Sequence, residues 1–179
     1  MTATKHTVVA LVVDEPGVLN RVASLFRRRN FNIESIAVGH SEISGVSRMT
    51  IVIDGVNTAV EQVRKQLEKL IEAVRVIDIT DERIVARELA LIKVKATSST
   101  RSEITQIVDI FRAKIVDVAS DSVLIEITGD EEKIDSLCHL LKGFGIKELA
   151  RTGRIALTRG VIRSVKSSKA LGSKGRHKK

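Results

Sequence analysis

The spacing of apolar residues in this chain switches between a strand period and a helix period, and the same order of switches occurs twice. Residues 7–13 form a short apolar run typical of a buried strand, whereas the apolar positions in 18–29 recur as on one face of a helix. Two strand patterns, a helix pattern and a further strand pattern follow before residue 80. The order βαββαβ predicts an antiparallel sheet with both helices on one face.

Local signals give further detail within this first half. In the segment 31–38 the apolar positions change phase, which indicates a β-bulge near Ser35. Residues 40–45 combine polar residues with Gly and are typical of a hairpin loop. The other elements expected here are a strand at 49–53, a helix at 60–71 and a strand at 74–79.

The same order returns in the second half, although residue identities do not match between the halves. The repetition therefore concerns architecture and not sequence. The elements expected here are a strand at 88–96, a helix at 104–111, strands at 114–118 and 123–128, a helix at 134–141 and a last strand region at 146–157.

Together the two halves predict an α+β protein with two consecutive ferredoxin-like βαββαβ domains. We expect these domains at 5–80 and 88–160, joined by a linker at 81–87. Helices on one face of a sheet leave its other face bare, and several strands carry Ile and Val on both faces. We therefore expect dimerisation, or packing of one domain on the other, to cover the bare face.

The net charge of +8 belongs to the C-terminus. Residues 159–179 contain eight Lys and Arg and no acidic residue, which leaves 22 basic and 22 acidic residues in 1–158. We expect 161–179 to be a solvated, disordered basic tail, because it has few apolar residues to offset the cost of ordering. Transient contact with an anionic polymer is the alternative.

The sequence lacks the motifs that most enzyme and membrane classes require. No apolar run approaches the roughly 20 residues of a membrane helix, and the N-terminus lacks the layout of a secretory signal, which predicts a cytoplasmic protein. No Walker loop, GxGxxG, HExxH or GxSxG motif occurs. The single cysteine, Cys138, excludes an internal disulfide and falls on an apolar helix stripe, as a core residue would. We expect no catalytic residue, no metal site and no cofactor bound by this chain.

A polar constellation stands where the first strand meets the first helix. Gly17 lies at the start of that helix, where backbone N–H groups lack partners and the helix dipole is positive, so a small carboxylate is favoured there. Asp14 offers an acceptor to an ammonium group, and Asn32 offers both a donor and an acceptor. These groups suit a zwitterion such as an amino acid. The alternative is a plain β–α turn capped by Asp14, and spacing alone favours that interpretation.

Longer motifs favour the ligand-binding interpretation. The pattern Asp14-x-Pro16-Gly17-x-Leu19, followed by a helix rich in Val and Leu, resembles the ACT domain, a βαββαβ module that senses small molecules. Further stretches resemble the small subunit of acetohydroxyacid synthase, also called acetolactate synthase. They are 25–36 (LFRRRNFNIESI), 47–51 and 62–76 in the first half, and 87–94, 110–118 and 150–157 in the second.

This resemblance implies a regulatory subunit of an enzyme of branched-chain amino acid biosynthesis. The partner would be a catalytic large subunit that uses thiamine diphosphate, Mg²⁺ and usually FAD. We expect the second domain of this chain to supply the contacts that activate it. The chain would form a homodimer through its ACT domains and confer feedback inhibition by valine. The resemblance also implies roles for individual residues. Gly17, Val18 and Leu19 would donate backbone N–H groups to the carboxylate of valine, Asp14 and Asn32 would contact its ammonium group, and Ile33 would line the apolar pocket.

Two other classes share some of these features. RNA-recognition modules have the same order of strands and helices, but they need aromatic residues on their central strands for base stacking, and neither 7–13 nor 47–53 contains one. A free-standing enzyme would need more chain and more motifs than are present. Nucleic acid is therefore not an expected partner.

Overall fold

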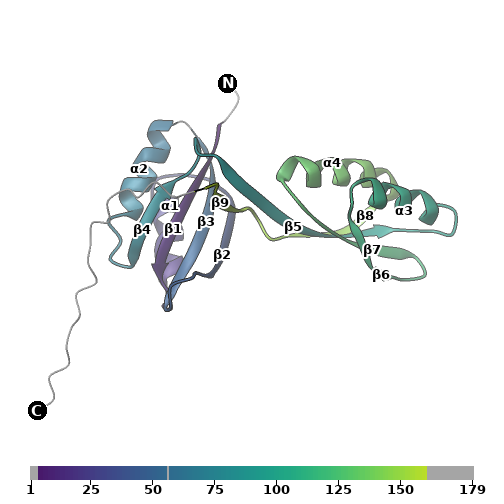
Figure 1. Ribbon diagram of the computed structural model, residues 1–179, viewed down its shortest axis with the longest axis horizontal. Helices are drawn as coiled ribbons and strands as arrows, with labels where there is room; N and C mark the ends of the chain where they lie inside the picture. The colour runs from purple at the N-terminus through teal and green to yellow at the C-terminus, as the bar shows by residue number, and fades with distance from the viewer. Residues whose placement is uncertain (1–3, 56, 161–179) are drawn as a thin grey trace, which may run out of the picture.

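The computed structural model describes residues 4–55 and 57–160, which form two α+β domains side by side (Figure 1). The first domain has a four-stranded antiparallel sheet with the strand order β2-β3-β1-β4. Its elements are β1 (Thr4–Val13), α1 (Val18–Arg28), β2 (Ile33–His40), β3 (Val46–Gly55), α2 (Asn57–Leu67) and β4 (Ala73–Asp78). The predicted βαββαβ order is confirmed for this half.

The second domain repeats this order with one additional strand. The sheet order is β6-β7-β5-β8, and β9 pairs with β5 away from that path. Its elements are β5 (Ile84–Lys95), α3 (Arg101–Ile110), β6 (Lys114–Val118), β7 (Ser122–Gly129), α4 (Glu131–Leu141), a 3₁₀ turn (Lys142–Phe144), β8 (Ile146–Arg151) and β9 (Ile155–Thr158).

The apolar stripes form the two cores as expected. Even-numbered residues of β1 pack with α1 and α2 in the first domain, and even-numbered residues of β5 pack with α3 and α4 in the second. The predicted bulge is confirmed, because the β2–β3 register shifts between Ile33 and Ser35. The expected helix at 60–71 extended too far. The helix α2 ends at Leu67, and Ile71, which is 93% exposed, lies in the turn that follows.

The linker expected at 81–87 is wrong in part. Residues 84–87 are already strand: they form the first third of β5 and pair with β9, with Arg87 opposite Ile155 and Ile84 opposite Thr158. The single strand region expected at 146–157 is two strands, because the chain leaves the second sheet after Arg151 and joins the β5–β9 ribbon from Ile155. The tail expected at 161–179 lies outside the described residues.

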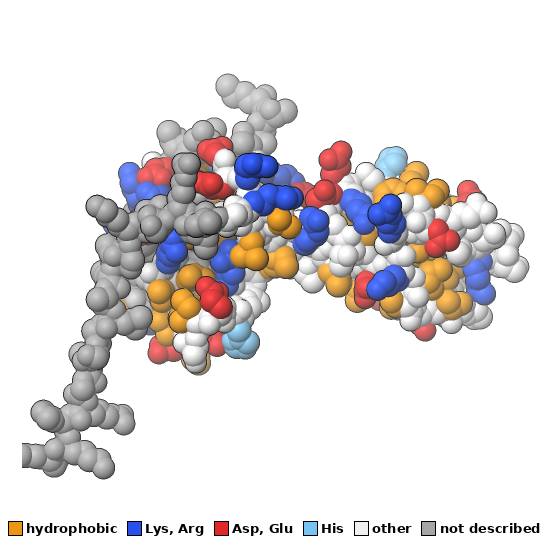
Figure 2. Space-filling model, viewed as in Figure 1, with side chains coloured by type: hydrophobic (Ala, Val, Ile, Leu, Met, Phe, Trp, Pro, Cys, Tyr) orange, Lys and Arg blue, Asp and Glu red, His pale blue; other side chains and the backbone are white. Residues whose placement is uncertain are grey.

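The β5–β9 ribbon covers the face of the first sheet that the helices leave bare. Val9, Ile79 and Ala156 are buried together there, with Ile84 and Ala86 packed against them. The bare face of the first sheet is therefore covered by packing of one half of the chain on the other, which is one of the two alternatives expected from the sequence. Figure 2 shows apolar and basic side chains together where the ribbon leaves the first domain. None of the described helices is long and apolar enough to cross a membrane.

Candidate functional site

The turn between β1 and α1 places Gly17 as the residue that precedes the helix. Its φ of 89° and ψ of −12° are left-handed, a conformation that costs most side chains energy. A Cβ atom built at this position would meet nothing within 4 Å. The backbone conformation, and not crowding by neighbours, therefore explains the glycine, and the space above it is open.

Several backbone N–H groups at this helix start have no partner in the described part of the chain. The N–H groups of Gly17, Leu19 and Asn20 have no acceptor among the residues that the structure describes, and the first turn of α1 contains no acidic residue. The N–H of Val18 donates instead to the carbonyl oxygen of Glu15, at 3.4 Å. Of the three N–H groups expected to bind a carboxylate, those of Gly17 and Leu19 therefore have no acceptor in the described residues, whereas that of Val18 has one, and the Val18 side chain is buried in the core. The sequence analysis missed Asn20, which the rule of four unpaired N–H groups at a helix start includes.

The carboxylate of Asp14 is held at the edge of this turn. The Ser47 hydroxyl donates to its Oδ1 at 3.1 Å, and Nδ1 of His40 lies 3.3 Å from its Oδ2. No backbone N–H within the described ranges donates to this carboxylate, so Asp14 does not cap α1 as the plain-turn interpretation requires. Its side chain is 46% exposed. A carboxylate that can accept hydrogen bonds and a group of N–H donors therefore lie on the same turn, and both are exposed.

Asn32 and Ile33 lie at the opposite end of the first sheet. Ile33 pairs with Ile53, which pairs with His6 near the start of β1, whereas Asp14 and Gly17 follow Val13 at its end. His6 and Val13 are seven positions apart along β1, so at about 3.3 Å per residue the two ends are roughly 23 Å apart. Within one chain the structure does not bring Asn32 and Ile33 together with Asp14 and Gly17.

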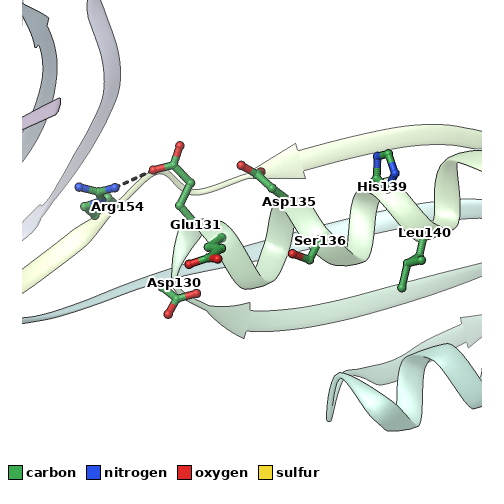
Figure 3. A pocket seen from close by; sticks show the side chains of 8 residues that line it. Asp130, Glu131, Asp135, Ser136, His139, Leu140 and Arg154 are labelled. Atoms are coloured by element: carbon green, nitrogen blue, oxygen red, sulfur yellow. Dashed lines mark hydrogen bonds and ion pairs between the residues drawn. The ribbon is translucent and has the colours of Figure 1, made fainter. Parts of the chain in front are cut away.

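Other polar groups of the described residues are not arranged as a metal site or as a nucleophile paired with a base. No cluster of His, Cys, Asp and Glu suited to a metal ion occurs in the described part of the chain. Burial raises the pKa of the Cys138 thiol, and its side chain packs against the second core. A hollow of about 900 Å³ runs along the outer side of α4 (Figure 3), where Glu131 pairs with Arg154 and where Asp135 and His139 follow along the helix. This hollow contains no nucleophile activated by a base.

Comparison with known proteins identifies the family. Residues 9–75 match the model of the AHAS small subunit-like ACT domain, and residues 87–160 match that of the small subunit of acetolactate synthase. The chain is 56% identical over 156 residues to a probable acetolactate synthase small subunit of Archaeoglobus fulgidus, a match covering 87% of this chain and 98% of the relative. It is 50% identical over 169 residues to the acetolactate synthase small subunit of Bacillus subtilis, with 93% and 98% covered.

A solved structure agrees with these matches. The crystal structure of the acetolactate synthase small subunit from Thermotoga maritima has a TM-score of 0.81 and 43% identity to this chain, covering 88% of this chain and 99% of that one. The fold and the turn at Gly17 thus define an ACT-domain protein with a second ferredoxin-like domain. More specifically, the chain belongs to the family of acetolactate synthase small subunits. This membership is consistent with a regulatory, non-catalytic subunit and does not favour the nucleic-acid-binding alternative.

Proposed function

We propose that this chain activates the catalytic large subunit of acetolactate synthase and makes it sensitive to valine, which binds at the β1–α1 turn. The observation that carries the proposal is the group of N–H donors of Gly17, Leu19 and Asn20 that lack acceptors in the described residues, beside the partly exposed carboxylate of Asp14. The donors suit a carboxylate and Asp14 suits an ammonium group. An α-amino acid carries both.

The distance between the two halves of the predicted site supports binding between two copies of the chain. Among the strands that the structure describes, β2 lies at the edge of its sheet and pairs with β3 alone. If two copies pair their β2 strands antiparallel about a two-fold axis, Asn32 at the start of one β2 meets His40 at the end of the other. His40 lies beside Asp14, so each site would combine Asp14 and Gly17 of one copy with Asn32 and Ile33 of the second copy. The homodimer would thus contain two equivalent sites.

A titration of the purified chain with valine, leucine and isoleucine tests the choice of ligand. Heat released by valine at a stoichiometry of one per chain supports the proposal, and no heat from any of the three refutes it. The effect on activity is tested on the complex with the large subunit, by comparing Gly17→Asp with Gly17→Asn. Both residues are of similar size and accept the left-handed backbone, so only the aspartate adds a negative charge where the carboxylate of the ligand would lie. Feedback inhibition should persist in part for the neutral variant and be lost for the charged one.

We further propose that the second domain supplies the contacts that activate the large subunit. The face of its sheet opposite to α3 and α4 has no cover within the described chain and carries apolar residues such as Leu91, which is 36% exposed. The partner would contribute thiamine diphosphate, Mg²⁺ and FAD, and this chain would bind none of them. Leu91→Glu should weaken activation, whereas Leu140→Glu should not, because Leu140, 49% exposed, lies on α4 away from that face. Equal activation by both variants would contradict this assignment.

A further inference from the structure

Besides the β5–β9 ribbon, a second contact joins the two domains within the described residues. The segment 152–154, which connects β8 to β9, passes directly beside the start of β2. There the backbone N–H of Arg154 donates to the hydroxyl of Ser35 at 2.9 Å. Ser35 is two positions from Ile33, one of the residues proposed to bind the effector.

This contact leaves no space for a further side-chain atom. Gly153 has a φ of 78°, and a Cβ atom there would lie 2.6 Å from the hydroxyl oxygen of Ser35 and 3.5 Å from the carbonyl oxygen of Ile36. A displacement of β2 at Ser35 toward Gly153 must therefore move the 152–154 segment as well, because packed atoms cannot interpenetrate.

Charged side chains extend the contact to the start of α4. Arg154 donates to the Thr7 hydroxyl on β1 at 3.2 Å and to the Glu131 carboxylate at 2.6 Å (Figure 3). Lys5 on β1 forms ion pairs with Glu131 and, at 2.5 Å, with Glu34 on β2. The hydrogen bond from Lys5 lowers the pKa of Glu131 and raises that of Lys5, so both remain charged at neutral pH. Glu131 is the first residue of α4, where the helix dipole also favours a negative charge.

These residues link the start of β2 to a helix of the second domain. We call them the interdomain cluster: Lys5, Glu34, Ser35, Glu131, Gly153 and Arg154.

We propose that the interdomain cluster relays binding of the effector to the second domain, and hence to the large subunit. The inference rests on the proposed function, because it takes Asn32 and Ile33 as effector residues. Glu34 and Ser35 directly follow them, so a ligand that repositions the start of β2 alters the contacts of Arg154 and Lys5 with α4. A ligand shifts activity only if it binds one conformation of the protein more tightly than another. The contacts of Arg154 and Lys5 would be the difference between these two conformations.

The test uses the full-length chain with its large subunit and two mild variants, Arg154→Gln and Ser35→Ala. Three quantities are measured: activation without valine, the Kd for valine by calorimetry, and the maximal inhibition by saturating valine. The relay predicts activation within about twofold and a Kd within about threefold of the wild type, while maximal inhibition falls to less than about half. Arg64→Gln is the matched control. It removes a guanidinium that pairs with Glu61 and Glu68 within α2 and its following turn, and it should leave all three quantities unchanged.

A second comparison tests the close contact itself. Gly153→Ala should reduce maximal inhibition further, and adding Ser35→Ala to it should restore part of that loss, because the hydroxyl nearest to the new methyl group is then absent. Full inhibition of Arg154→Gln and Ser35→Ala would overturn the relay and leave the proposed function intact. A parallel fall in activation, affinity and inhibition would also overturn it, since that result indicates a general loss of structure. A wild-type chain that binds no valine would instead refute the proposed function, and the relay with it.

Discussion

Mixing two defective variants should restore valine binding if each effector site is built from two copies of the chain. The variants are Gly17→Asp, which disables the N–H donors of α1, and Asn32→Ala, which removes the amide at the start of β2. Each loss of charge-assisted hydrogen bonding should cost about 1.5–3 kcal/mol, or roughly 10- to 150-fold in Kd. Each variant alone should therefore bind valine at least about tenfold more weakly than the wild type.

The mixture should differ because the proposed dimer has two-fold symmetry. When equal amounts of the two chains exchange freely, about half of the dimers contain one chain of each kind. In such a dimer, one site combines both substitutions, and the other combines an unchanged Gly17 with an unchanged Asn32. About one quarter of all sites in the mixture should then bind valine with wild-type affinity.

Calorimetry measures this as a stoichiometry of about 0.25 valine per chain. Native mass spectrometry of chains carrying different tags serves as the control, because it shows whether exchange has occurred. If the mixed dimers form and no site recovers, Gly17 and Asn32 do not act across two chains. The separation of roughly 23 Å between the two ends of the sheet within one chain would then have to be bridged in another way, and the proposed dimer would be refuted.

Two further predictions concern stability. Ile92→Ala should lower the free energy of unfolding by about 2–5 kcal/mol, because Ile92 is fully buried in the second core. Urea denaturation at fixed chain concentration measures this change, and a loss below about 1 kcal/mol would contradict the assigned packing. Glu131→Gln should lower the free energy of unfolding by about 0.5–1 kcal/mol at neutral pH. The hydrogen bond from Lys5 lowers the pKa of Glu131 in the folded chain below its unfolded value of about 4.5. Between these two pKa values the unfolded chain binds more protons than the folded chain. The loss of stability caused by Glu131→Gln should therefore be complete above about pH 4.5 and should disappear as the pH falls through the folded pKa. Denaturation series of both proteins at several pH values test this, and a cost that does not change with pH would show that the ion pair with Lys5 does not cause it.

Local periodicity was sufficient to predict the elements that lie within each domain. Amphipathic helices, alternating strands and the bulge before Ser35 all follow from residues close together in the sequence, and the structure confirms them. The β5–β9 ribbon depends instead on pairing between 84–87 and 155–158, about seventy positions apart, and no local pattern reports such a pairing. A short strand beside charged residues is for this reason easily taken for a linker.

The sequence indicated which chemical groups could form the candidate site but not where these groups lie. Gly17 and Asp14 were found because a glycine before a helix and a nearby carboxylate have direct local meanings. Asn32 was grouped with them because its amide offers both a donor and an acceptor. The helix α1 has 11 residues, however, and at 1.5 Å per residue it carries the chain about 16 Å toward the other end of the sheet. That length was available from the sequence, and it is the signal that would have placed Asn32 at the opposite end. The hydrogen bond from the Val18 N–H to Glu15 could not be predicted from the sequence, because it depends on the conformation of the turn that contains Glu15.

The pairing of Arg87 with Ile155 makes the second domain a topological insertion into the first, although the sequence presents the two as consecutive. The strands on either side of residues 88–154 already lie next to each other as an antiparallel pair. Excising that segment and joining its flanks with a two-residue Asn-Gly turn should therefore leave a self-contained ACT domain that retains its own apolar cover. A cut after Thr80, by contrast, would leave Val9 and Ile79 without that cover and favour aggregation.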